Sequence, residues 1–108
     1  MGNRGAAPLT EAMFYVLMAF SRGELCGTEI SAAVNRRTEG RVRLGPGTLY
    51  TILGRFLEDG LIVETSVQGR QRNYRLTEKG SAVYQAELAR LRRCLADAEK
   101  EAHHGDPM

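Results

Sequence analysis

The 108-residue sequence predicts a mainly α-helical fold with one small β-hairpin and a long C-terminal helix. The first sign is an apolar stripe with helical spacing that follows a Gly-Pro-Gly segment at 45–47. The second is a pair of strand-like segments on either side of a glycine, and the third is a seven-residue apolar repeat near the C-terminus. A chain of this length has room for one domain with one modest hydrophobic core.

The first predicted helix carries more apolar residues than one face needs. Thr10 is suited to cap it, because a threonine hydroxyl accepts a hydrogen bond from a free backbone N–H. One set of apolar residues recurs with helical spacing: Ala12, Met13, Val16, Leu17 and Phe20. A second set widens the apolar surface: Phe14, Tyr15 and Met18. We expect the second face to meet another subunit, since a domain this small cannot cover both.

A second helix is expected to begin at Gly27 or Thr28 and to end at Arg37. The sequence 38–40 then turns the chain, and 42–44 forms a short extended segment. The third helix, the candidate recognition helix, follows.

The third helix is predicted to start at Pro46, whose fixed φ is already helical and whose missing N–H would have no partner there. Its apolar stripe consists of Leu49, Ile52, Leu53, Phe56 and Leu57. The other side carries Thr48, Thr51, Gly54, Arg55 and Glu58, with Tyr50 at the border. Gly60 is placed to end the helix.

Two strand-like segments, 61–67 and 71–76, bracket a tip where Gly69 can supply the positive φ of a tight turn. One face of the first strand is predicted to hold Leu61, Val63, Thr65 and Val67. The tip presents Arg70, Gln71 and Arg72. A helix with a small exposed face, followed by a hairpin rich in arginine, is typical of a winged helix-turn-helix that binds DNA.

Positive charge is concentrated in the same region. The net charge of +2 is small, but residues 36–75 carry eight arginines against four acidic residues. Residues 77–102 carry five charges of each sign. The excess therefore lies where a phosphate-binding surface requires it, although a charge cluster by itself could also be a generic solvated face.

The C-terminal segment 77–102 is predicted to be one helix that starts after Thr77. Its apolar seam follows a heptad spacing: Tyr84, Leu88, Leu91, Leu95, Ala98 and Ala102. At ~1.5 Å per residue this helix is about 39 Å long, more than the small body can cover. The seam predicts a second chain, with folding back onto the body as the alternative. We expect residues 1–8 to be flexible and 103–108 to be a disordered tail.

Other classes of function have little support. The sequence shows no nucleophile–base pair, clustered metal ligands or phosphate loop, so no enzyme and no cofactor is expected. Neither a membrane span nor a signal peptide is indicated, so the expected location is the cytoplasm. Cys26 and Cys94 are expected to be reduced structural residues. The alternatives are a metal- or redox-responsive regulator that uses them with His103 and His104, and a winged helix that contacts only proteins.

Five segments together resemble the PadR family of bacterial transcription regulators. They are L-T-E-A-M-F-Y-V-L at 9–17, C-G-T-E-I at 26–30, G-R-V-R-L-G-P-G-T-L-Y at 40–50, L-E-D-G-L-I at 57–62 and Y-R-L-T-E-K-G at 74–80. The resemblance covers about residues 10–100. It implies a homodimeric winged-helix repressor of a pseudo-palindromic operator, with dimer contacts through the first and last helices and release from DNA by a small molecule.

These residues and the resemblance lead to two expected surfaces and one expected effector site. The DNA-binding residues are Arg43, Gly47, Thr48, Tyr50, Thr51, Arg55, Arg70, Gln71 and Arg72. The dimer-interface residues are Phe14, Tyr15, Tyr84, Leu88, Leu91 and Leu95. A small-molecule effector would bind near the dimer seam. The single C-terminal helix corresponds to the short branch of the family, and the absence of tryptophan means that effector sites built from tryptophan do not carry over.

Overall fold

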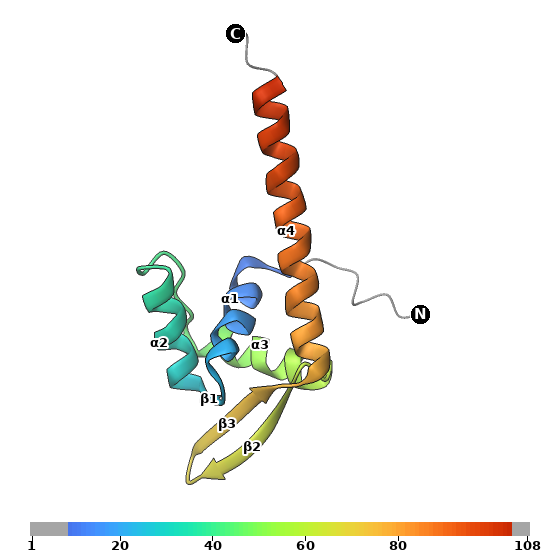
Figure 1. The fold of residues 1–108 in the computed structure, drawn as a ribbon. Coiled ribbons are helices and arrows are strands. Elements are labelled where there is room, and N and C mark those ends of the chain that lie inside the picture. Colours follow the sequence, from blue (N-terminus) through green and yellow to red (C-terminus); the bar gives the residue numbers. More distant parts are fainter. Residues whose placement is uncertain (1–8, 105–108) are drawn as a thin grey trace.

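The computed structural model describes residues 9–104 and confirms the mainly helical winged helix-turn-helix (Figure 1). In chain order the elements are α1 (Glu11–Ala19), the 3-10 helix η2 (Phe20–Arg22), β1 (Leu25–Cys26), α2 (Gly27–Arg37), α3 (Pro46–Glu58), β2 (Ile62–Gln68), β3 (Gln71–Leu76) and α4 (Glu78–His104). The first three α-helices and the sheet form a body, and α4 rises from it on the side opposite the β2–β3 hairpin (Figure 1).

The core of the body lies where the apolar stripes of the three helices meet the base of the hairpin. Its most buried side chains are Val16, Leu17, Ile30, Val34, Leu53, Phe56 and Ile62. Four residues of the predicted α3 stripe are buried, but Leu57 is 39% exposed. It lies at the edge of the apolar stripe, whereas Phe56 in the same turn is fully buried.

The ends of the helices follow from their sequence. The hydroxyl of Thr10 accepts the backbone N–H of Met13 at 3.1 Å and so caps α1 as predicted. At the end of α3, Gly60 adopts a φ of +75°. The N–H of Leu61 then reaches the carbonyl of Phe56 at 2.8 Å, and that of Gly60 reaches Leu57 at 3.1 Å. This pair of bonds is a Schellman motif, which turns the chain directly into β2.

The sheet has three strands in the order β1-β3-β2, not the two that the sequence predicts. β1 is only two residues long, so it carries no periodic signal, and it pairs Leu25 with Tyr74 and Cys26 with Asn73. The hairpin itself is confirmed: Gln68 pairs with Gln71 across a two-residue turn, and Gly69 has a φ of +63°.

A bulge in β2 makes one prediction about the hairpin wrong. Glu64 pairs with Tyr74 and Ser66 pairs with Asn73, so Thr65 is an extra residue opposite β3. The extra residue reverses the alternation of side chains, and Val63 and Val67 therefore lie on opposite faces instead of sharing one.

α4 is joined tightly to the body at its start. The hydroxyl of Thr77 accepts the N–H of Gly80 at 3.0 Å and donates to the carbonyl of Gly60 at 2.7 Å. A Cβ on Gly80 would lie 2.1 Å from the carbonyl oxygen of Leu61, so only glycine fits there. The helix then packs on α1, where Phe14 stacks on Tyr84 with ring centroids 5.5 Å apart.

The far end of α4 departs from the predicted boundary. The helix continues to His104, so residues 103 and 104 are helical and do not belong to a disordered tail. The helical pattern has no stop signal there, and the apolar seam had set the predicted end at Ala102. The predicted flexible segment 1–8 and the remainder of the tail, 105–108, lie outside the described residues. None of the helices within 9–104 is long and apolar enough to cross a membrane.

Candidate nucleic-acid interface

The outer face of α3 carries mostly small side chains and is open to solvent. Gly47, Thr48, Thr51 and Arg55 are all exposed on it. A Cβ added to Gly47 or Gly54 would meet nothing within 4 Å, so no residue of the described range 9–104 covers this face at these two positions. A smooth helix face with two hydroxyls and one guanidinium can approach base edges and phosphates closely. Arg55 is the one partly engaged member, 3.6 Å from Asp59 on the next turn.

Tyr50 points away from the outer face of α3, toward the start of α2. Its side chain is 55% exposed, yet its hydroxyl lies so close to Gly27 that a Cβ there would be 2.7 Å from the oxygen. Gly27 therefore leaves room for the tyrosine. The hydroxyl is held at the junction of the two helices, while much of the ring stays accessible.

The tip of the hairpin meets this junction. A groove of about 480 Å³ is lined by Cys26, Gly27, Thr28, Tyr50, Arg70, Gln71 and Arg72. It brings together Tyr50 and the three predicted hairpin residues. Gly27 and Thr28, at the N-terminus of α2, were missed as site residues. A signal for them was available, because a glycine that begins a helix beside a hydroxyl residue leaves its free N–H groups open to an anion.

The two arginines of the hairpin tip differ in their surroundings. Arg72 donates to both carboxylate oxygens of Glu64 on β2, at 3.0 and 3.3 Å. Arg70 lies in the turn and forms no ion pair with any residue in the described part of the chain. The free guanidinium of Arg70 is available to a phosphate. The guanidinium of Arg72 is already paired with Glu64, so a phosphate would have to compete with that carboxylate.

The segment before α3 holds one exposed arginine and one structural arginine. The side chain of Arg43 donates to the carbonyl of Gly40 at 3.2 Å and remains exposed outside the groove. Arg41 instead binds Glu11 at 2.6 Å and the hydroxyl of Tyr15 at 3.0 Å. The hydrogen bond that Arg41 donates to Glu11 raises the pKa of Arg41. Arg41 thus ties the α2–α3 loop to α1, and part of the positive excess counted in the sequence serves the fold.

The predicted dimer residues divide into two groups, and the half-buried Leu88 lies between them. Phe14, Tyr15 and Tyr84 contact one another or their neighbours within the chain, as the stacked rings of Phe14 and Tyr84 and the edge contact of Phe14 with Tyr15 show. Leu91 and Leu95 are 37% and 59% exposed, and every described side chain from 91 onward is exposed. No residue that the structure describes covers this second group.

Cys26 and Cys94 lie in different parts of the described structure. Cys26 is buried at the start of α2, where its sulfur lies 3.3 Å from the hydroxyl of Thr28. Cys94 is exposed on the outer half of α4. Among the residues that the structure describes, no group of three His, Cys, Asp or Glu side chains could hold a metal ion.

Comparison with known proteins identifies the family. The model of the "Transcriptional regulator PadR-like family" matches residues 16–86. The chain belongs to this family. The expected class of protein, a regulator and not an enzyme, is confirmed at the level of the family.

Relatives of known structure share the fold at low sequence identity. A transcriptional regulator from Clostridium thermocellum superposes with a TM-score of 0.73 at 22% identity, over 82% of this chain and 87% of that one. The structure of Bacillus subtilis PadR in complex with operator DNA matches with a TM-score of 0.62 at 21% identity, over 70% of this chain and 45% of that one.

A curated relative in sequence is an uncharacterised 37.1 kDa protein in transposon TN4556 of Streptomyces fradiae. It is 38% identical over 84 residues, which are 75% of this chain and 24% of that protein. The chain therefore spans about a quarter of the length of this relative.

Proposed function

We propose that this PadR-like regulator is a homodimeric repressor that binds a pseudo-palindromic operator through α3 and the hairpin. The observation that carries the proposal is the groove in which Tyr50 of α3, the first residues of α2 and the arginines of the hairpin tip meet. In this arrangement α3 occupies the major groove, the start of α2 and Tyr50 contact the flanking phosphate, and Arg70 and Arg72 reach the adjacent backbone or minor groove. Binding to operator DNA by the related Bacillus protein supports it.

The dimer follows from the uncovered half of α4. Burial of a leucine side chain stabilises an association by about 1.5–3 kcal/mol. Leu91 and Leu95 of two chains would bury four such side chains. A two-fold axis through this seam sets the two α3 helices against half-sites about 34–36 Å apart, which is one turn of DNA. A regulator that acts on operator DNA in this way works in the bacterial cytoplasm.

An effector would act where α1 and α4 meet. Phe14 and Tyr84 stack at this contact, which joins the DNA-binding body to the helix of the dimer seam. A small molecule that inserts beside these rings would change the angle between body and seam, and with it the distance between the two α3 helices. Repression and its release would then share one mechanism.

The DNA-binding proposal is tested by selecting a binding sequence from fragments of the source genome and measuring affinity by fluorescence anisotropy. Tyr50→Ala is expected to weaken binding by about ten- to a hundredfold, the range that corresponds to about 1.5–3 kcal/mol for a hydrogen bond to a charged group such as a phosphate. Gly27→Ala keeps the Tyr50 side chain but forces its hydroxyl to move away from the new methyl group. We expect a smaller loss of DNA affinity than in Tyr50→Ala.

Ser81→Ala, on the exposed side of α4, is the matched control and should bind like the wild type. Circular dichroism must show that all three variants are folded. Unchanged affinity in both Tyr50→Ala and Gly27→Ala would contradict the assignment of the groove to DNA. The metal- or redox-responsive alternative predicts instead that affinity changes with zinc or with a thiol oxidant, and that Cys94→Ser removes this response.

A further inference from the structure

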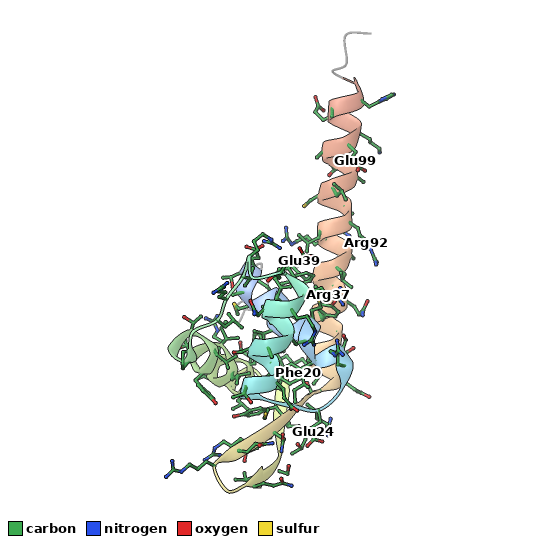
Figure 2. The ribbon with its side chains drawn as sticks, turned by 90° about the vertical axis from the view of Figure 1, so that its left-hand side faces the viewer. Phe20, Glu24, Arg37, Glu39, Arg92 and Glu99 are labelled. Carbon is green, nitrogen blue, oxygen red and sulfur yellow. The ribbon has the colours of Figure 1, made fainter. Side chains whose placement is uncertain are left out.

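A hydrogen bond between side chains joins the hairpin to the segment that precedes β1. The hydroxyl of Thr65 on β2 donates to a carboxylate oxygen of Glu24 at 2.6 Å, and the two residues are 41 positions apart in the chain. Because β3 lies between β1 and β2 in the sheet, this bond spans the middle strand. Figure 2 shows Glu24 at the end of the body next to the hairpin.

Thr65 lies where the backbone ladder of the hairpin is interrupted. It is the bulge residue of β2, so it has no paired residue on β3. The support from β1 ends at almost the same level, because Cys26 pairs with Asn73 and Asn73 pairs with Ser66. Beyond this level the hairpin is a two-stranded ribbon, which is marginally stable without other contacts. The bond from Thr65 to Glu24 is therefore formed at the boundary between the supported base and the tip.

Glu24 is held by the backbone on both sides. Before it, the N–H of Gly23 donates to the carbonyl of Phe20 at 3.0 Å, and Gly23 has a φ of +117° that favours glycine. After it, Leu25 and Cys26 pair with β3. A carboxylate that is anchored in this way can hold the hairpin in place.

Electrostatic attraction to DNA does not account for an acidic residue at this position. Glu24 is exposed, and it takes part in none of the ion pairs formed among residues 9–104. A carboxylate close to a phosphate-binding surface repels DNA. Neither Glu24 nor Thr65 lines the groove that holds Tyr50 and the arginines of the tip. The bond to Thr65 therefore points to a role in placing the hairpin.

The position of the tip depends on the angle of the hairpin at Thr65. Gly69 of the turn follows Thr65 by four residues, so at about 3.3 Å per residue the tip lies roughly 13 Å away. Over that length, a swing of about 10° moves the tip by roughly 2 Å. A hydrogen bond from an arginine to a phosphate needs an N···O distance of about 2.7–3.2 Å, so a shift of this size breaks it.

We propose that Glu24 and Thr65 are positioning residues for DNA binding. Their hydrogen bond fixes the angle of the hairpin on the body, and it thereby sets where the guanidinium groups of Arg70 and Arg72 meet the DNA backbone or the minor groove. Neither Glu24 nor Thr65 contacts the DNA itself. The inference rests on the proposed function and deepens it, because it adds two residues outside the groove that determine how the groove is used.

Substitutions at both ends of the bond test its role, with fluorescence anisotropy on the operator fragment selected from the source genome. Thr65→Val keeps the shape and charge of the side chain but removes its hydroxyl, and we expect binding to weaken about three- to tenfold. Thr65→Ser keeps the hydroxyl and should bind like the wild type. Glu24→Ala should weaken binding as Thr65→Val does. Glu24→Gln keeps an oxygen acceptor and should bind at least as tightly as the wild type.

Glu99→Ala is the matched control for the loss of one negative charge. Figure 2 shows Glu99 on the part of α4 that stands clear of the body, and its substitution should leave operator affinity unchanged.

Two further measurements separate positioning of the tip from a general loss of stability. In an Arg70→Ala background, Thr65→Val should cost less affinity than in the wild type, because one of the two positioned guanidinium groups is already absent. Amide hydrogen exchange of the free protein should become faster for residues 66–72 in Thr65→Val, while the amides of the core helices exchange as in the wild type.

Tighter binding of Glu24→Ala together with unchanged binding of Thr65→Val would show that Glu24 acts only by repelling DNA, and it would overturn the inference. A loss in Thr65→Val that is equally large with and without Arg70 would overturn it too, because the effect would not act through the hairpin tip. A wild-type chain that binds no genomic fragment with sequence specificity would overturn the proposed function itself before any variant is compared. The two failures are therefore distinguishable.

Discussion

Two surfaces of the chain lie open, and their chemistry is opposite. The face formed by α3 and the hairpin exposes glycine, threonine and arginine, whereas the outer half of α4 exposes Leu91 and Leu95. Water solvates the first face well and the second poorly. An open polar and basic face is stable in water without a partner and can bind an anionic partner when one is present. An open leucine seam favours association with another apolar surface at once. We therefore expect the proposed dimer to persist without DNA, and we expect DNA binding to require the dimer.

The largest expected effect comes from breaking the apolar surface. Leu91→Glu places a carboxylate in the seam of each chain, and we expect the dimer to dissociate at micromolar concentration. The cost exceeds the lost burial of two leucines, about 3–6 kcal/mol, because the seam would also have to desolvate two carboxylates. Light scattering measures the mass, and anisotropy measures operator affinity, which should fall with it. A monomer that still binds the full operator as tightly as the wild type would contradict the expectation that DNA binding requires the dimer.

A second prediction compares the same substitution at two glycines. Gly80 lies where α4 joins the body, and Gly54 lies on the DNA-binding face of α3. Gly80→Ala would press a methyl group against the carbonyl of Leu61 and should destabilise the fold by about 1–3 kcal/mol. Gly54→Ala meets nothing within 4 Å and should stabilise α3 by about 0.5–1 kcal/mol. Urea denaturation measures both.

Gly54→Ala also sharpens the description of the DNA-binding face. If DNA packs closely against this glycine, the variant gains stability and loses operator affinity together. Equal affinity of variant and wild type would show that Gly54 is only a tolerated surface glycine.

The third prediction separates the two arginines of the hairpin tip. Arg70→Ala should weaken binding to all sequences about equally and reduce the slope of log affinity against log salt by roughly one. Glu64→Gln should act in the opposite direction, because it removes a negative charge and frees Arg72 from its ion pair. Anisotropy titrations at several salt concentrations give both values. An Arg70→Ala variant with unchanged affinity and slope would make the hairpin a purely structural element.

The smallest expected effect is a pH dependence within α4. The hydrogen bonds from Arg90, at 2.6 and 3.0 Å, lower the pKa of the buried Glu87. Because the pKa is lower in the folded state, this contribution to stability is present above the unfolded-state pKa of about 4.3 and is lost as the pH falls through the folded-state value. Glu87→Gln should therefore be less stable than the wild type near neutral pH, and the difference should shrink in acid. Denaturation at several pH values checks this, and a gap that is constant with pH would contradict it.

Several elements can be predicted from local patterns in the sequence. Pro46, the α3 stripe and Gly60 place the third helix because capping and helical periodicity are properties of neighbouring residues. The same holds for Gly69 in the hairpin turn and for the long C-terminal helix after Thr77. Family membership also follows from the sequence, because the matching motifs are continuous segments.

Which of these side chains are free to bind a partner depends on contacts between residues far apart in the chain. Sequence spacing does not reveal that Arg41 is bound to Glu11, 30 residues away, or that Arg72 is shared with Glu64 across the hairpin. It does not reveal β1 either, because a two-residue strand exists only through its pairing with β3. The position of the Tyr50 hydroxyl above Gly27 is likewise a contact between two helices. Contacts between residues distant in the chain depend on how the elements pack, and local periodicity carries no information about that packing.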